Sequence, residues 1–200
     1  MFTLKEITMT FTEYYEKVAH LGFDSDIEDF RDQFVDAMNR AFRQVTRVRP
    51  RMGILTDISL EEGHGIVKID VKESIKDDYG SLPMNPVRMS DGTLYRSDRY
   101  IMLNRNTVMF LPSAEAGVYM IDYVRRTPKF NYDNFESDED VDIDDDLSDV
   151  LVLIVAYYTF LDDDESKATN YLSRAMEMLT EINSTQSTHS PGGYKEIVRW

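Results

Sequence analysis

Residues 138–146 are the densest group of potential metal ligands in the chain, because seven of the nine carry a carboxylate. Three aspartates match the first three ligand positions of a calcium loop: Asp138, Asp140 and Asp142. The sixth position is Ile143, where the sharp turn needs glycine, and the twelfth is Asp149 in place of glutamate. The sequence therefore predicts no metal site here, and the run is interpreted as a solvated linker that adds negative charge at a helix N-terminus.

Residue types that support catalysis are scarce. The chain has no cysteine, no Gly-x-Ser-x-Gly motif and no glycine-rich phosphate loop. The three histidines are predicted in different settings, with His20 in a helix, His64 in a glycine turn and His189 in a polar tail. We therefore expect no catalytic residue and no cofactor site, and the chain is not predicted to be an enzyme.

One dense basic cluster interrupts the acidic sequence, and it consists of Arg40, Arg43, Arg47, Arg49 and Arg51. The first three are spaced to share one face of a helix near its C-terminus, where positive charge is favourable. Two interpretations stay open. The cluster either balances the helix dipole and local carboxylates, or it forms a subunit interface with acidic surface on an identical neighbour.

The N-terminal third must supply the helix that carries this cluster. Thr10 and Glu13 form a capping box that predicts a short helix ending near Gly22. From about Asp26, apolar residues recur every three or four positions, and Pro50 ends this long second helix.

Residues 148–183 predict a helical hairpin. Val150 to Leu161 is apolar on every side except Thr159, so as a helix it must be surrounded by protein. It is too short to span a membrane. Four acidic residues, 162–165, separate it from a second helix with a single apolar stripe. The first helix therefore needs cover from other helices or from neighbouring subunits.

Residues 53–127 predict a small antiparallel β insertion, because short alternating segments are separated by turn residues. Residues 54–58 and 66–71 are interpreted as two strands about the glycine turn at Gly63, and further strands are expected over 93–103, 107–111 and 118–124. Residues 81–90 contain two prolines and are expected to be an irregular loop.

The last segment, residues 184–200, combines a polar stretch with an aromatic end. The polar stretch cannot bury enough surface to fold alone. The end contains Tyr194, Ile197, Val198 and the single tryptophan, Trp200. We expect it either to bind a partner protein or to fold back onto its own bundle.

Composition narrows the function further. A formal net charge of −15 argues against a sequence-reading DNA binder, which needs a basic surface. Three interpretations of the negative charge stay open. It keeps the protein soluble, it repels DNA that slides past the protein, or it imitates DNA and so blocks a basic protein. We expect no signal for export and no membrane span.

The hairpin resembles the C-terminal part of head-to-tail adaptor (connector) proteins of tailed bacteriophages, on residues 150–158, 161–168 and 171–179. Residues 34–42 also look like the long first helix of those proteins. The resemblance implies a structural, non-enzymatic virion protein that is made in the host cytoplasm. It further implies a homo-oligomeric ring, a dodecamer, below the portal protein, with nozzle or tail hub proteins on its tail side and double-stranded DNA passing through without specific binding.

These expectations combine into one α+β fold: a helical bundle, made of a long N-terminal helix and a C-terminal αα-hairpin, with a small antiparallel β insertion and an extended C-terminal tail. The expected parts are N-terminal helices over 1–52, the β-rich insertion over 53–127, an acidic linker over 128–147, the hairpin over 148–183 and the tail over 184–200. Tyr194, Ile197, Val198 and Trp200 are the predicted portal-binding residues, and Arg40, Arg43 and Arg47 are the predicted subunit interface. The alternative function is an acidic interaction module, a monomer or dimer, that mimics DNA and blocks a basic nucleic-acid-binding protein.

Overall fold

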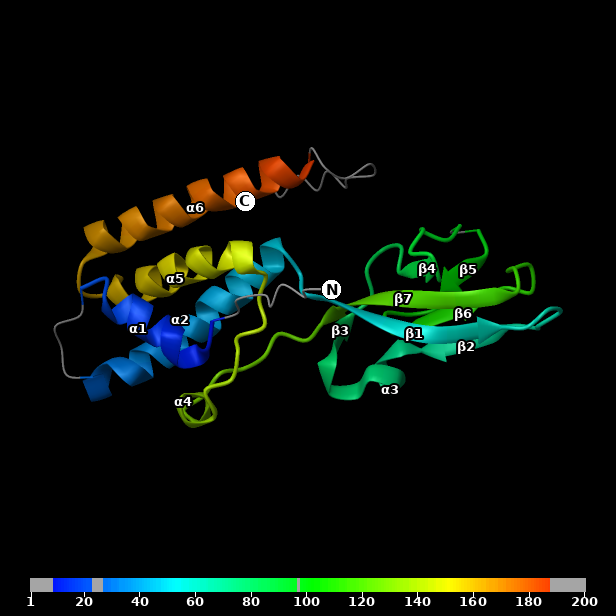
Figure 1. The fold of residues 1–200 in the computed structure, drawn as a ribbon, viewed down its shortest axis with the longest axis horizontal. Helices are drawn as coiled ribbons and strands as arrows, with labels where there is room; N and C mark the ends of the chain where they lie inside the picture. The colour runs from blue at the N-terminus through cyan, green and yellow to red at the C-terminus, as the bar shows by residue number, and fades with distance from the viewer. Residues whose placement is uncertain (1–8, 23–26, 97, 188–200) are drawn as a thin grey trace, which may run out of the picture. The chain divides into compact units, whose positions relative to one another are not determined.

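The computed structural model describes residues 9–22, 27–96 and 98–187 of the 200-residue chain. The chain divides into two compact units (Figure 1). Residues 1–45 and 129–200 form the helical unit, and residues 46–128 form the β unit.

The helical unit begins with two helices, α1 (Phe11–Ala19) and α2 (Ile27–Val48). The predicted capping box opens α1, because the Glu13 N–H donates to Thr10 Oγ1 at 3.2 Å and the Thr10 N–H donates to Glu13 Oε2 at 2.9 Å. Two residues after α2 comes Pro50, as the sequence predicts. Both helices are therefore specified by local signals.

The second half of the helical unit is the predicted hairpin, α5 (Asp145–Phe160) and α6 (Glu165–Ser187). Every residue from Val150 to Ala156 is buried. Helices α1 and α6 pack against α5, and Tyr158 of α5 donates a hydrogen bond to Gln44 Oε1 of α2 at 2.9 Å. The chain therefore covers its most apolar helix with its own helices, and α5 does not require a neighbouring subunit. None of the helices in the described ranges is long and apolar enough to cross a membrane.

An aromatic cluster joins α1 and α2 to the segment that leads into α5. The Phe11 ring lies 5.3 Å from Phe34, 5.4 Å from Phe130 and 4.9 Å from Phe135, measured between centroids. Phe135 belongs to the short helix α4 (Asp133–Ser137). Residues 129–144 are thus packed onto the helices by their apolar side chains, although most of their other residues are acidic.

The β unit contains two antiparallel sheets. The four-stranded sheet is built around the longest pair of strands, and its members are β1 (Met52–Leu60), β7 (Gly117–Arg125), β3 (Tyr79–Ser81) and β4 (Val87–Met89). The three-stranded sheet has the order β2 (Val67–Asp70), β6 (Thr107–Phe110), β5 (Tyr100–Met102). A short helix α3 (Val71–Ile75) and a 3-10 turn η1 (Lys76–Asp78) follow β2.

The two sheets share one core. Tyr119 and Ile121 of β7 are buried with Val108 and Phe110 of β6. Gly53 pairs with Tyr123 across β1 and β7, and a Cβ at Gly53 would lie 2.3 Å from the Tyr123 ring. Glycine at this position therefore lets the tyrosine ring lie over the neighbouring strand.

The expected fold of a helical bundle with a small β insertion is wrong. Within the described ranges the fold is α+β, with six α-helices and two antiparallel sheets of seven strands in total. The β unit has its own hydrophobic core, so it is a second body of structure and not a minor insertion. A strand of three or four residues contains too few alternating positions to be recognised in the sequence. The sequence therefore predicts a smaller β region than the structure has. The extended tail lies outside the described residues beyond Ser187, where α6 ends.

Three local expectations in the β unit are also wrong. Residues 81–90 are not an irregular loop throughout, because β3 ends at Ser81 and β4 pairs with β7. The strands at 54–58 and 66–71 do not form a hairpin, since β1 pairs with β7 and β2 pairs with β6. Of the described residues in the range 93–103, only 100–102 form a named strand. Each of these errors concerns which segments pair with each other. The local sequence pattern does not specify strand pairing.

Candidate interaction surfaces

The three arginines of the predicted interface are all exposed on α2. Arg40 Nη2 lies 2.7 Å from Asp36 Oδ2 one turn earlier, and its guanidinium lies 5.9 Å from the centroid of the Tyr158 ring. Arg43 Nε donates to the Asn39 carbonyl at 2.9 Å. Arg40 and Arg43 therefore both have partners within the chain, and the three arginines lie three and four residues apart on α2, the spacing of one helix face.

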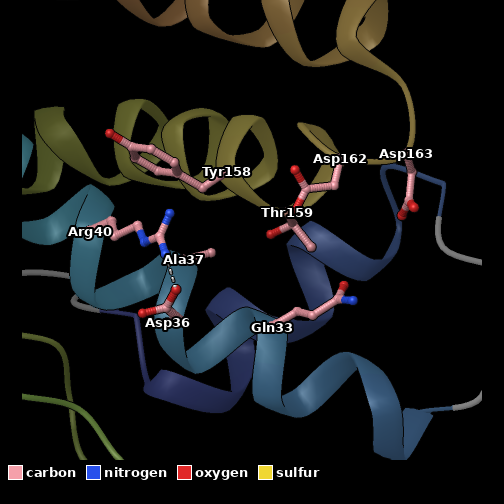
Figure 2. A pocket seen from close by; sticks show the side chains of 8 residues that line it. All are labelled: Gln33, Asp36, Ala37, Arg40, Tyr158, Thr159, Asp162 and Asp163. Atoms are coloured by element: carbon pink, nitrogen blue, oxygen red, sulfur yellow. Dashed lines mark ion pairs between the residues drawn. The ribbon is translucent and has the colours of Figure 1, made fainter.

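A small pocket lies between α2, α5 and the turn that follows α5 (Figure 2). Its lining is mostly polar and consists of Gln33, Asp36, Ala37, Arg40, Tyr158, Thr159, Asp162 and Asp163. Figure 2 shows the Arg40–Asp36 pair on one side, with Asp162 and Asp163 on the other. The volume of about 120 Å³ is below the roughly 300–1,000 Å³ of pockets that bind small molecules. This pocket does not resemble an enzyme active site.

The acidic segment has structural tasks at two helix N-termini. Asp138 Oδ1 accepts the Thr12 N–H of α1 at 3.3 Å, although the two residues are 126 positions apart. Hydrogen bonds from the side chains of Thr12 and Thr10 lower the pKa of Asp138. Asp145 and Asp146 lie in the first turn of α5, as predicted for negative charge at a helix start. No group of three or more histidine or acidic side chains in the described part of the chain could hold a metal ion.

Two of the three histidines, His20 and His64, lie within the described residues, and each belongs to a different unit. His20 caps the C-terminal end of α1. Both ring nitrogens of His64 face backbone carbonyls, Nδ1 at 2.7 Å from Gly65 and Nε2 at 3.0 Å from Ala114. His64 is therefore a turn residue that ties two loops of the β unit together. His189 lies outside the described residues.

Exposed apolar side chains gather in the β unit. Of the eleven large apolar residues found exposed in the described ranges, all but Tyr132 belong to this unit. They are Met52, Ile54, Ile66, Met84, Met89, Leu94, Ile101, Met102, Leu103 and Val118. Single exposed apolar residues are ordinary, but such a concentration in one unit is typical of an interaction surface.

Charge is divided between the units in the opposite sense. The helical unit contains 10 basic and 26 acidic residues, a formal net charge of −16. The β unit contains 12 basic and 11 acidic residues, a formal net charge of +1. The acidity that dominates the whole chain is therefore confined to the helical unit.

Sequence reasoning missed these outer surfaces of the β unit. Within the strand expected over 118–124, Tyr119, Ile121 and Tyr123 alternate onto one face of β7, and all three are buried. A signal for the second surface was present, because Val118, Met120 and Val124 on the opposite face of the same strand are also apolar. The four predicted portal-binding residues, Tyr194, Ile197, Val198 and Trp200, all lie outside the described residues.

Comparison with known proteins gives one match that spans both units. A family model described as SU10 adaptor protein matches residues 9–194, which includes the helical hairpin, the β unit and α2. No curated protein matches the sequence. Because the match covers most of the chain, this protein belongs to the SU10 adaptor protein family, a family of phage head–tail adaptors.

Proposed function

We propose that this chain forms a homo-oligomeric ring, a dodecamer, between the portal protein and the tail-side proteins of a bacteriophage. The nozzle or tail hub attaches below the ring, and double-stranded DNA passes through it without specific binding. The ring is a non-enzymatic part of the virion and is made in the host cytoplasm. Membership of the SU10 adaptor protein family over residues 9–194 is the observation that carries the proposal.

The separation of charge supports a DNA conduit. A net charge of −16 on the helical unit repels the phosphate backbone, so helical surface that lines a lumen would let DNA slide without adhering. The nearly neutral β unit has no such repulsion and suits contact between proteins.

Electron microscopy of the purified protein, alone and with its portal protein, tests the ring. The expected result is a closed ring with a central opening that seats on the portal. A chain that stays a monomer or dimer, ignores the portal and binds a basic nucleic-acid-binding protein would instead support the DNA-mimic alternative.

Arg40, Arg43 and Arg47 are proposed to contact acidic surface on the neighbouring subunit of the ring. Arg43 and Arg47 are both exposed on α2, and a neighbouring copy would offer them the strongly acidic surface of its helical unit. The double variant Arg43→Glu, Arg47→Glu should weaken ring assembly while the helix content measured by circular dichroism stays unchanged.

A matched control for the arginines is Lys129→Glu, Arg174→Glu, which makes the same change of charge at two other exposed residues. Equal loss of assembly in both double variants would show that total charge, and not this cluster, controls the ring.

The aromatic end, residues 194–200, is proposed to bind the portal or a neighbouring subunit, because tyrosine and tryptophan often anchor interfaces. Since α6 continues to Ser187, a truncation after Ser187 removes the end without shortening the helix. The truncated chain should keep its thermal unfolding midpoint and lose portal binding. Serine at Tyr194, Ile197, Val198 and Trp200 should have the same effect at full length, and normal portal binding by both variants would refute the anchor.

A further inference from the structure

The outer face of the four-stranded sheet is apolar around one internally neutralised ion pair. On β7 the outward residues alternate with the buried Tyr119, Ile121 and Tyr123. We call this surface the four-strand face and define it by Met52, Ile54, Val118 and Met120 around Arg88 and Asp122. Met52 pairs with Val124, Ile54 with Asp122, and Arg88 with Met120, so all share the outer side.

The ion pair leaves no free charge at the centre of this face. Arg88 Nε bonds the Asp122 carboxylate, and Arg88 Nη1 donates to the Gly92 carbonyl at 3.2 Å. The Asp122 side chain is only 9% exposed. By contrast, Met52, Ile54 and Val118 are each between 46% and 53% exposed. The face therefore offers apolar surface with little polar competition.

The three-stranded sheet has a second apolar outer surface. Tyr100 pairs with Phe110 and Met102 with Val108, and this register directs Phe110 and Val108 into the core. Ile101 pairs with Met109, which pairs with Lys68, so these three lie on the other side. We call this surface the three-strand face and define it by Ile66, Lys68, Ile101 and Met109. Ile66 is 59% exposed and Ile101 is 43% exposed.

The two faces point in opposite directions. Both sheets turn their inner faces toward the same core, so their outer faces lie on opposite sides of the β unit. A ring built from identical subunits needs two different patches on each copy, because every contact joins one patch to the other patch of the next copy. A single partner protein on the tail side would require only one such face.

The charges of the two units favour another copy of the chain as the partner of these faces. Two helical units, each with a net charge of −16, repel each other strongly, whereas two β units, each with a net charge of +1, repel each other only weakly. The β unit also carries almost all of the exposed apolar surface. Contact between copies is therefore least opposed where the β units meet.

We propose that the four-strand face of one copy packs on the three-strand face of the next copy, so that the β units form a continuous belt. This inference rests on the proposed ring and assigns the surfaces that close it. The outer sheets then meet at roughly the 10 Å spacing of packed β-sheets. Ile54, Val118 and Ile101 become buried in each contact.

Cysteine cross-linking tests the belt sharply, because the chain has no cysteine of its own. Single variants Ile54→Cys and Ile101→Cys place one thiol on each face, and a double variant carries both. Each full-length chain is treated with a bismaleimide of about 10 Å reach, with and without purified portal protein. The double variant should give a ladder of oligomers, a mixture of the two single variants should give only a dimer, and each single variant alone should remain uncross-linked.

The possible outcomes separate this inference from the proposed function. A dimer from one single variant alone would show that a face pairs with itself, which overturns the belt. Rings seen by electron microscopy without a ladder from the double variant would also overturn the belt and leave the ring standing. Absence of both rings and ladder would refute the proposed function together with this inference.

Charged variants provide a second measurement. Ile54→Glu with Val118→Glu, and separately Ile101→Glu, should each weaken assembly at least about tenfold by burying an unpaired carboxylate. Met84→Glu is the control, because Met84 is 82% exposed in the loop between β3 and β4 and lies on neither face. Assembly reduced equally by all three would contradict the assignment of the faces.

Discussion

The helical unit and the β unit differ in the kind of side chain that they expose to solvent. Among its described residues the helical unit exposes only one large apolar side chain, Tyr132, and it buries every side of α5 from Val150 to Ala156, while its formal net charge is −16. The β unit leaves ten large apolar residues exposed and has a net charge of only +1. Solubility and repulsion of phosphate thus belong to one unit, and surface suited to association belongs to the other.

Ion pairs differ between the units in the same way. In the helical unit, Lys17–Asp149 spans 3.4 Å with side chains 50% and 70% exposed, so water screens it strongly. In the β unit, Arg125–Asp78 spans 2.9 Å with side chains 33% and 35% exposed, and Asp122 is more buried still. The Lys17–Asp149 ion pair of the helical unit therefore lies on the surface. The two ion pairs of the β unit are partly buried and held within the fold.

The largest expected effect tests whether the two units are separate bodies. Phe34 in the helical unit and Phe110 in the β unit are both fully buried. Changing either to alanine should cost about 3–5 kcal/mol of stability, by the loss of apolar contact and the cavity left behind. Hydrogen exchange should show lost protection in α1, α2 and α5 for Phe34→Ala, and in β6 and β7 for Phe110→Ala.

Exposed Gln33→Ala on α2 is the control for these two variants and should change little. If both phenylalanine variants release amides equally across the whole chain, the units unfold together and the comparison between them fails.

The next effect concerns the neutralised ion pair. Arg88→Met leaves the Asp122 carboxylate without its main partner and should cost about 1–3 kcal/mol in urea unfolding, discounted because Arg88 is 40% exposed. The double variant Arg88→Met, Asp122→Leu should recover most of this loss, because no charge is then left buried. A double variant as unstable as Arg88→Met would mean that Asp122 holds the strands for another reason.

The capping box should show a smaller effect. Thr10→Ala removes the acceptor for the Glu13 N–H and should cost about 1 kcal/mol of stability in the helical unit. Thr180→Ala in the middle of α6 is the matched control, because Thr180 Oγ1 only bonds the Met176 carbonyl one turn earlier. Thr180→Ala should be neutral or slightly stabilising. Equal losses of stability in the two variants would show that the capping box does not stabilise α1.

The smallest effect depends on pH and again contrasts the units. Hydrogen bonds lower the pKa of Asp138 in the folded state, chiefly from the side chains of Thr12 and Thr10. The stability that this carboxylate adds is therefore present above its unfolded pKa of about 3.9 and is lost as pH falls through the lower folded pKa. Asp138→Asn should flatten this part of the acid unfolding curve.

Asp91 of the β unit is the matched comparison, because the Thr93 backbone N–H and side chain lower its pKa from only two residues away. Asp91→Asn should alter a single turn, whereas Asp138→Asn loosens a contact between α1 and a distant segment. We expect Asp138→Asn to change the acid unfolding curve more than Asp91→Asn does. A larger change for Asp91→Asn would contradict this expectation.

Much of the helical unit could be predicted because its signals are local. The capping box at Thr10, the apolar spacing of α2 up to Pro50 and the hairpin of α5 and α6 each depend on residues close together in sequence. The buried face of β7 follows from alternation in the same way.

The rest depends on distant partners. Val87–Met89 becomes a strand only because β7, some thirty residues later, offers a free edge, and Ile54 lies on an outer face only because of its register with Asp122. Phe130 and Phe135 belong to the helical core because they pack on Phe11, although their segment is rich in acidic residues and its sequence predicts a linker.

The sequence by itself determined the class of helices, the absence of cysteine, the total charge and the likeness to phage adaptors. Only the tertiary structure decided that the sheets form a second body, that the acidity is confined to the helical unit, and that two apolar faces point away from a shared core. The physical reason is that helix signals repeat within a few residues, whereas strand pairing and exposure depend on contacts between residues far apart in the chain.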